Sequence, residues 1–272
     1  MKKYLALVGT FILGAALLLA GCGSDTKTAS TSGQTVLKVG ASPVPHAEIL
    51  EHVKPLLAKE GIDLKIVEFT DYNTPNLSLA DKELDANFFQ HVPYMNEFAK
   101  AHNLKLVSAG SVHVEPMGVY SKKIKSLSEL KDGDKIAIPN DQTNGGRALI
   151  LLDKLGLIKL KDPANILSTV NDIVENSHNY QFIELEAAQL PRSFDDITVS
   201  VINTNYALEA GLNPTADSLA LESKDSPYVN ILTVRAGEEN NPAIKKLVAA
   251  LQSEDTKKFI EEKYKGAILP AF

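Results

Sequence analysis

An aromatic group in residues 85–94 has the types and spacing to hold an apolar, polarisable side chain. The segment reads Asp-Ala-Asn-Phe-Phe-Gln-His-Val-Pro-Tyr. In an extended chain Phe89 and His91 point the same way, because side chains alternate between faces with a period of two. If a helix begins near residue 91, Tyr94 lies one turn further on, and the three rings could form a cage. A thioether against such rings gains about 0.3–1.5 kcal/mol. An ordinary aromatic core cluster is the alternative.

Tyr72 is a further aromatic candidate, in the segment Asp-Tyr-Asn-Thr-Pro-Asn at residues 71–76. Most of this segment is explained by a strand-to-helix turn in which Thr74 or Asn76 caps the helix. Turn chemistry does not account for the tyrosine, which could instead line a cleft.

Residues 139–147 could hold a carboxylate. They separate a strand pattern from a helix pattern, and Thr143 or Asn144 is the expected N-cap. Free backbone N–H groups at a helix start favour an anion. Arg147 is unfavourable for the helix dipole in the first turn, but it could form a bidentate pair with a carboxylate. A surface arginine paired with Asp141 is the alternative.

Asparagines near predicted strand ends could complete a site for a zwitterion. Asn203 and Asn205 follow the apolar run 197–202, and Asn230 follows Tyr228. An amide side chain has donors and an acceptor, so it can receive an ammonium through its carbonyl and donate to a carboxylate. Capping and turn roles are the alternatives for each asparagine.

Catalysis receives little support from the motifs. No GxSxG, HExxH, GxxxxGK[ST] or GxGxxG pattern occurs. His91 could act as a base with Asp85, but no nucleophile is evident for it to activate. A helix expected at 46–59 carries His46, Glu48, Glu51 and His52, which we interpret as a solvated face and not as a metal site. The histidines without clustered acidic partners are expected to be ordinary polar residues: His102, His113 and His178. We expect no enzyme, no cofactor and no metal.

The single cysteine of the 272-residue chain marks a predicted lipid anchor. Lys2 and Lys3 precede an uncharged, Leu- and Ala-rich run that ends in Leu-Ala-Gly-Cys at residues 19–22. This pattern predicts a signal peptide over 1–21, and it looks like a lipobox in which Cys22 is lipidated and becomes the mature N-terminus. A transmembrane helix is the alternative, but the run holds three glycines and stands at the very N-terminus.

Charge and composition limit the partners. Residues 22–34 are rich in Ser, Thr and Gly and predict a flexible tether, because they cannot bury enough surface to offset their ordering entropy. The formal net charge of −6 argues against nucleic acid as a partner. We expect a soluble domain held at the outer side of a membrane.

Strand and helix patterns alternate in two series, which predicts an α/β fold with a largely parallel sheet. The first series has strands at 36–40, 64–69 and 104–109 and helices at 46–59, 75–82 and 91–102. The second has strands at 135–139, 181–185, 197–202 and 228–234 and helices at 144–157, 187–194, 242–251 and 255–264. Two series in about 235 residues favour two lobes, with polar clusters at the strand ends where small molecules bind in such folds.

These segments together resemble the NlpA family of substrate-binding lipoproteins, the methionine-binding components of ABC importers. The matching stretches are DYNTPN, LDANFFQHVPY, YSKKIKSLSELKDGDKIAIPNDQTNGGRALILL, GLIKLKD, ELEAAQLPRSFDD, VINTNYALEAGL and SPYVN. The resemblance implies a two-lobed fold like that of type II periplasmic binding proteins, with a ligand cleft between lobes that crossing strands join. We expect lobe 1 to comprise 35–118 and 228–272, and lobe 2 to comprise 119–227.

The resemblance also implies roles for individual residues. Arg147 would pair with the carboxylate of a methionine-type ligand, and four asparagines would bind its polar groups: Asn144, Asn203, Asn205 and Asn230. The thioether side chain would lie among Tyr72, Phe89, His91 and Tyr94. Gly145 and Gly146 replace a more usual x-Gly before the arginine, which gives that loop additional backbone freedom.

A permease and its ATPase are the protein partners that the resemblance implies, and Cys22 would hold the chain at a cell membrane on its extracytoplasmic side. Two alternatives remain open at this point. The ligand could be a methionine-containing dipeptide or another amino acid, or the chain could be a surface adhesin without a transport role.

Overall fold

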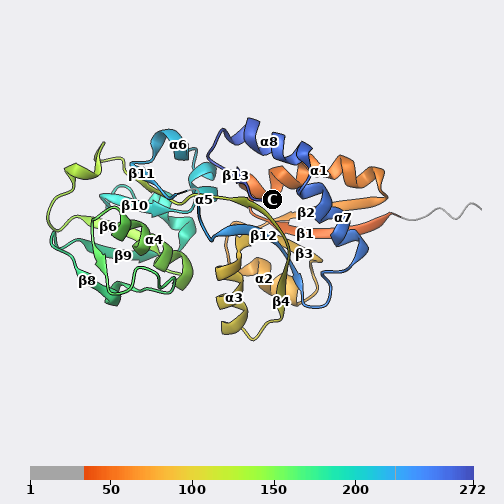
Figure 1. Ribbon diagram of the computed structural model, residues 1–272, viewed down its shortest axis with the longest axis horizontal. Helices are drawn as coiled ribbons and strands as arrows, with labels where there is room; N and C mark the ends of the chain where they lie inside the picture. Colours follow the sequence, from red (N-terminus) through yellow and green to blue (C-terminus); the bar gives the residue numbers. More distant parts are fainter. Residues whose placement is uncertain (1–33, 224) are drawn as a thin grey trace, which may run out of the picture. The chain divides into compact units, whose positions relative to one another are not determined.

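Two main β-sheets organise the computed structural model, which describes residues 34–223 and 225–272 (Figure 1). The predicted signal peptide, Cys22 and all of the predicted tether except Gln34 lie outside the described residues. Among the described residues, no helix is long and apolar enough to span a membrane.

The first sheet is built mostly from the N-terminal part of the chain. Its strands, in spatial order, are β13 (Leu269–Pro270), β4 (Leu106–Val114), β12 (Val229–Arg235), β3 (Ala86–His91), β1 (Thr35–Ala41) and β2 (Ile62–Glu68). Helices α1 (Glu48–Lys59), α7 (Pro242–Leu251) and α8 (Glu254–Tyr264) contribute to the apolar core of this sheet. Leu50, Phe88 and Leu247 are fully buried there, and each such side chain contributes about 1.5–3 kcal/mol.

The second sheet is built from the middle of the chain. Its strands, in spatial order, are β11 (Ala220–Leu221), β5 (Gly118–Tyr120), β10 (Val199–Ile202), β6 (Lys135–Pro139) and β9 (Gln181–Leu185). Helix α4 (Gln142–Lys154) packs on it through Leu149 and Leu152, which share a core with Ile138 and Val199. A separate ladder pairs β7 (Lys159–Leu160) with β8 (Ile173–Glu175).

The α/β prediction is confirmed, but the expectation of a largely parallel sheet is wrong. β1 is parallel to β2 and β3, whereas β12 is antiparallel to both β3 and β4. In the second sheet β6 is parallel to β9 and β10, whereas β5 is antiparallel to β10. The antiparallel strands include those by which the chain changes sheet. The alternation of apolar and polar residues predicts that a segment is a strand, but it does not predict in which direction the strand runs. The sequence therefore did not show that some neighbouring strands are antiparallel.

The chain changes sheet twice, along short connections. Residues 115–117 lead from β4 into β5, and residues 222–228 lead from β11 back into β12. The first connection can be followed in Figure 1, where the chain continues from the end of β4. Residues close to these connections can therefore meet side chains from either sheet.

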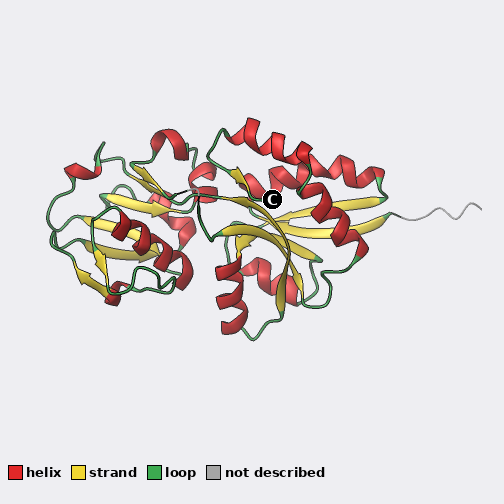
Figure 2. Ribbon diagram, viewed as in Figure 1, coloured by secondary structure: helices red, strands yellow, loops and turns green. Residues whose placement is uncertain are grey.

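Three strand–helix junctions place polar residues near the connections. β3 ends at His91 and leads into α3 (Val92–Ala101), β6 leads into α4, and β10 leads into α5 (Thr204–Glu209). The remaining short helices are α2 (Thr74–Ala80), α6 (Pro214–Asp217), η1 (Pro43–Ala47), η2 (Leu127–Glu129), η3 (Val170–Asp172) and η4 (Ala187–Arg192) (Figure 2). The sequence patterns had not predicted β5, α5 or the short strands β7, β8, β11 and β13.

Candidate functional site

A cavity is lined by residues of the first sheet together with residues of α4 and of the junction between β10 and α5. All nine residues that the sequence analysis singled out for ligand binding line it: Tyr72, Phe89, His91, Tyr94, Asn144, Arg147, Asn203, Asn205 and Asn230. Gln90, Glu115 and Thr204 line it as well, and sequence reasoning had not selected them.

The aromatic wall of the cavity consists of Tyr72, Phe89, His91 and Tyr94. Ring centroids lie 5.9 Å apart for Tyr72 and Phe89, 5.7 Å for Tyr72 and Tyr94, and 6.0 Å for Phe89 and Tyr94. These separations are typical of edge-to-face and tilted aromatic pairs. His91 caps α3, because its Nδ1 accepts a hydrogen bond from the backbone N–H of Tyr94 at 3.2 Å. The helix expected near residue 91 thus brings the rings together.

Hydrogen bonds across the cavity join residues of different elements. The Tyr72 hydroxyl donates to Asn205 Oδ1 at 2.5 Å. His91 Nε2 lies 3.1 Å from Asn144 Oδ1, which also accepts from Asn203 Nδ2 at 2.9 Å. Burial and the nearby Arg147 lower the pKa of His91 to about 3. The imidazole is therefore neutral near pH 7 and can donate from Nε2.

The N-terminus of α4 differs from the prediction in its cap and in its two glycines. Asp141 is the N-cap, and its carboxylate accepts from the backbone N–H of Asn144 at 2.9 Å. Gly145 and Gly146 lie inside the helix and do not form a free loop. A Cβ at Gly146 would stand 2.3 Å from the Ile166 carbonyl oxygen. The expectation of additional backbone freedom was wrong, because close approach of backbone requires glycine here.

Arg147 is buried, with 3% of its surface exposed, and it does not pair with Asp141. Its Nε and Nη2 donate to the Glu222 carboxylate, with Nη2 at 2.5 Å from Oε2, and Nη2 also donates to the Glu115 carbonyl oxygen at 2.7 Å. The guanidinium stacks on Tyr228 at 4.3 Å from the ring centroid. No hydrogen bond within the described part of the chain uses Nη1, so this nitrogen remains able to donate to a ligand.

Two asparagine atoms in the cavity lack partners. Asn203 Oδ1 and Asn205 Nδ2 are buried and make no hydrogen bond with any described residue. Leaving such an acceptor and donor unpaired costs about 1–3 kcal/mol each. One atom is an acceptor and the other a donor, so a molecule with both kinds of group would satisfy them.

His46, His113 and Glu115 form a buried cluster beside the cavity that the sequence analysis misinterpreted. His46 is 1% exposed and does not belong to a solvated face. Its Nε2 lies 3.0 Å from Asn230 Oδ1 and 3.2 Å from Glu115 Oε1. His113 Nε2 lies 2.7 Å from the same Glu115 oxygen. The spacing of residues 113 and 115 was a usable signal, because positions two apart share one face of an extended chain.

The other histidines also differ from expectation in part. His178 has an acidic partner, since its Nδ1 lies 2.7 Å from Asp132, and His52 Nε2 lies 2.7 Å from Asp255. Both histidines are partly or fully exposed and lie away from the cavity. His102 stacks on Phe98 at 4.2 Å between ring centroids. None of these three lines the cavity.

The fold and the cavity are those of a two-sheet α/β binding protein, and comparison with known proteins specifies the family. The NlpA lipoprotein family profile matches residues 37–272. The chain belongs to the NlpA lipoprotein family. The resemblance seen in the sequence motifs and the two-sheet fold expected from it are confirmed.

Relatives of this chain include named binding proteins. The D-methionine-binding lipoprotein MetQ of Salmonella typhi is 46% identical over 268 residues, which cover 97% of this chain and 96% of the relative. A nutrient-binding protein from Burkholderia cenocepacia, whose structure was solved bound to methionine, is 47% identical with a TM-score of 0.84. That match covers 87% of this chain and 100% of the solved chain.

A second solved relative is named for transport. It is an ABC transporter, periplasmic substrate-binding protein from Coxiella burnetii, 43% identical with a TM-score of 0.83. The match covers 86% of this chain and 100% of the solved chain. These relatives carry the names of binding proteins and not of enzymes.

Proposed function

We propose that this chain is a lipid-anchored extracytoplasmic protein that binds methionine and delivers it to an ABC importer. The family membership supports this function, together with relatives named for D-methionine binding, for a methionine-bound structure and for an ABC transporter. The observation that carries the proposal is the pairing, in one cavity, of an aromatic wall with unpaired polar atoms.

The cavity chemistry is complementary to an α-amino acid with a thioether side chain. The unused Nη1 of Arg147 would donate to the ligand carboxylate, as would the unpartnered Nδ2 of Asn205. The unpartnered Oδ1 of Asn203 would accept from the ammonium. Tyr72, Phe89, His91 and Tyr94 would surround the thioether, whose sulfur contacts aromatic rings favourably.

Asn230 and Asn144 have different roles in this proposal. Oδ1 of Asn230 lies 3.0 Å from His46 Nε2, so its Nδ2 is the group that would donate to the ligand carboxylate. Asn144 is already engaged on both sides, because Oδ1 accepts from Asn203 and Nδ2 donates to Asp141 at 3.0 Å. Asn144 would therefore act by holding Asn203 and His91 in place.

Ligand binding would be coupled to closure of two lobes. We assign lobe 1 to residues 35–118 and 228–272 and lobe 2 to residues 119–227, a division that the two sheets and their connections support. A ligand that contacts both lobes stabilises the closed form in proportion to those differential contacts. The closed form would then dock on a permease whose ATPase supplies the energy.

Isothermal titration calorimetry of the full chain in detergent, freed of bound ligand by denaturation and refolding, tests the ligand. We expect one methionine per chain, and titration of both enantiomers establishes the preference. Mass spectrometry of the material released on denaturation is the second readout. A methionine-containing dipeptide in stoichiometric amount would replace methionine as the ligand, and the absence of any released or titrated ligand would favour an adhesin.

Anchoring at Cys22 has its own test. The cysteine lies outside the described residues, so this proposal is supported by the lipobox pattern and by the lipoprotein family. Mass spectrometry of the mature chain should find a lipidated N-terminal Cys22, and Cys22→Ala should move the protein out of the membrane fraction. Persistence of the Cys22→Ala variant in washed membranes would contradict a lipid anchor.

A further inference from the structure

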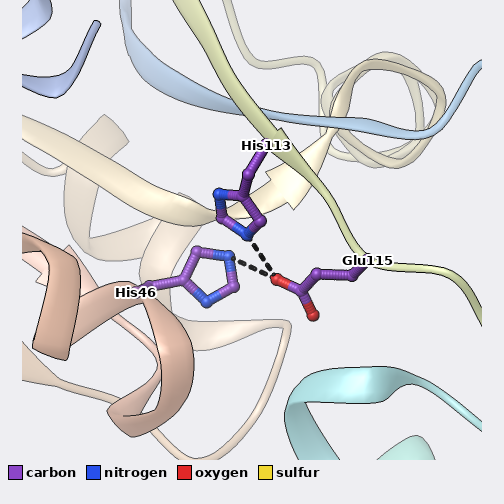
Figure 3. A group of neighbouring side chains, drawn as sticks. All are labelled: His46, His113 and Glu115. Atoms are coloured by element: carbon purple, nitrogen blue, oxygen red, sulfur yellow. Dashed lines mark hydrogen bonds and ion pairs between the residues drawn. The ribbon is translucent and has the colours of Figure 1, made fainter. Parts of the chain in front are cut away.

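The cluster of His46, His113 and Glu115 has no assigned role in the proposed ligand contacts. The three side chains come from η1, from β4 and from the connection that follows β4, and they converge on Glu115 Oε1 (Figure 3). The histidine side chains are 1% and 0% exposed, and the glutamate side chain is 6% exposed. Glu115 also lines the cavity, so the cluster adjoins the ligand site.

The His113 imidazole donates a hydrogen bond to the Glu115 carboxylate, and the His46 imidazole beside it donates to Asn230. Burial lowers the pKa of His46 to about 4 and that of His113 to about 3, so both rings are neutral near pH 7. A neutral ring that donates to a carboxylate must carry its proton on the nitrogen that faces it. His113 Nε2 lies 2.7 Å from Glu115 Oε1, and His46 Nε2 lies 3.0 Å from Asn230 Oδ1 and 3.2 Å from Glu115 Oε1. All of these oxygens are acceptors, so each ring carries its proton on Nε2.

The same three ligand atoms lie within 4.8 Å of one another, a spacing that a metal ion could also use. A metal-bound histidine normally donates its other ring N–H to a carboxylate, carbonyl or water. Nδ1 of His46 and Nδ1 of His113 have no hydrogen-bond partner among the described residues. The hydrogen-bonded arrangement therefore accounts for the cluster better than a metal site does.

Within residues 34–223 and 225–272, no lysine or arginine side chain binds the Glu115 carboxylate. The nearby Arg147 directs its Nε and Nη2 to the Glu222 carboxylate, and it reaches Glu115 only at the main-chain oxygen. Burial raises the pKa of Glu115, although the charge of Arg147 and a backbone hydrogen bond from Asn205 oppose this. A buried carboxylate without a cation is unfavourable, and a cation that entered the cavity would relieve that cost.

We propose that Glu115, held by His113 and flanked by His46, receives the protonated α-amino group of the ligand and makes a free ammonium a requirement for binding. This inference rests on the proposed function and adds a specificity to it. The unpartnered Oδ1 of Asn203 would accept a second N–H of the same ammonium. Acylated methionine and the α-hydroxy acid, which lack this cation, would leave the carboxylate buried and unpaired.

The test measures the affinity of each of three ligands for the wild type and for a variant. Titration calorimetry on the full chain uses methionine, N-acetylmethionine and 2-hydroxy-4-(methylthio)butanoate, with wild type and Glu115→Gln. We expect Glu115→Gln to weaken methionine binding by at least 30-fold. It should change the affinity for the hydroxy acid by no more than about threefold, because that ligand has no ammonium to lose.

The outcomes separate this inference from the proposed function. Equal losses for methionine and the hydroxy acid, or an unchanged methionine affinity, would overturn the role of Glu115. Failure of the wild type to bind methionine at all would instead overturn the proposed function. A wild type that binds the hydroxy acid as tightly as methionine would show that the ammonium is not required.

His113 is a positioning residue in this scheme, and a pair of variants tests it. His113→Gln keeps an N–H donor that can reach Glu115, whereas His113→Leu keeps bulk and removes the donor. We expect His113→Leu to weaken methionine binding by at least tenfold and the hydroxy acid by far less, with His113→Gln restoring most of the loss. Equal behaviour of the two variants toward both ligands would reduce His113 to a packing role.

His178→Gln is the matched control, because His178 also lies 2.7 Å from a carboxylate oxygen but is exposed and outside the cavity. Its affinities should equal those of wild type. Zn²⁺ alone, titrated into the wild type and into His113→Gln, tests the metal interpretation. Stoichiometric Zn²⁺ binding that the variant abolishes would overturn the hydrogen-bonded arrangement.

Discussion

The two ends of the cavity are organised differently. At the aromatic end Tyr72, Phe89 and Tyr94 contact one another, and the Tyr94 hydroxyl donates to the Tyr72 carbonyl oxygen at 2.9 Å. At the polar end Asn203 and Asn205 each retain a buried atom without a partner among the described residues. One end is satisfied within the protein, and the other is satisfied only when a ligand arrives.

This difference indicates how the energy of binding is divided. Contacts with rings add small increments for each atom, whereas a charged or amide group that loses its partner in a buried site costs much more. The polar end should therefore dominate affinity, and the aromatic end should select among ligands of the same charge.

Among changes at the polar end of the cavity, removal of Arg147 should cause the largest loss of methionine affinity. Arg147→Ala should weaken methionine binding by about 30-fold or more, corresponding to about 2–5 kcal/mol, because it strips the ligand carboxylate of its cation. It also leaves the Glu222 carboxylate without its partner. Calorimetry measures the affinity, and thermal unfolding of the variant shows that it is folded. An affinity equal to that of wild type would remove Arg147 from the site.

A single amide at the polar end should have the next largest effect. Asn230→Ala should weaken methionine binding at least tenfold, since hydrogen bonds to charged groups contribute about 1.5–3 kcal/mol. Asn140→Ala is the matched control, because Asn140 is exposed and does not line the cavity. If both variants bind methionine equally, Asn230 does not contact the ligand.

Acid should destabilise the fold through histidines at both ends of the cavity. The pKa values of His46, His91 and His113 are lowered to about 4, 3 and 3, mainly by burial, from an ordinary value of 6.5. Between about pH 6 and pH 4 the unfolded chain binds protons that the native chain does not, so stability falls as pH falls. Each histidine contributes up to about 1.4 kcal/mol per pH unit.

The raised pKa of Glu115 acts in the opposite sense, so the observed slope should be smaller than three protons would give. Urea unfolding at pH 7, 6 and 5 measures how the free energy of unfolding changes with pH. His91→Gln at the aromatic end and His113→Gln at the polar end should each reduce the slope by up to about 1.4 kcal/mol per pH unit. A slope that neither variant alters would show that these histidines titrate normally.

A change at the aromatic end of the cavity should have the smallest effect, and this effect should be on the preference between similar ligands. Norleucine replaces the methionine sulfur by a methylene, and the wild type should prefer methionine by up to about tenfold, since a sulfur–ring contact contributes about 0.3–1.5 kcal/mol. Phe89→Leu should narrow this preference while leaving the norleucine affinity nearly unchanged. Competition calorimetry provides the ratio, and an unaltered ratio in Phe89→Leu would place the sulfur away from that ring.

Local sequence patterns predicted most elements, and the motifs together with the family resemblance selected nine residues that line the cavity. The strand 135–139 and the helix 242–251 have the bounds expected of them, because an apolar run and a helical period are local properties. Strand β4 was expected to end at residue 109, but it continues to Val114. This additional stretch of β4, which the sequence had not predicted, carries His113. The error in the strand boundary therefore also hid a residue beside the cavity.

Sequence reasoning missed the partners of buried charges. Glu222 lies 75 residues from Arg147, and Glu115 lies 3.2 Å from His46, which belongs to the distant segment η1. No spacing rule connects residues so distant in the chain. The burial that makes such a pair necessary is itself a property of the fold, because a charge finds its partner only when both lose water.

The sequence by itself determined the family, the alternation of strands and helices, and the residue types that a zwitterionic thioether ligand would need. Tertiary structure alone decided strand direction, the pairing of Arg147 with Glu222, and the convergence of His46 and His113 on Glu115. The physical reason is that periodicity and motif chemistry depend on neighbours in the chain. Burial, desolvation and the partners of a buried charge depend on segments that meet only after folding.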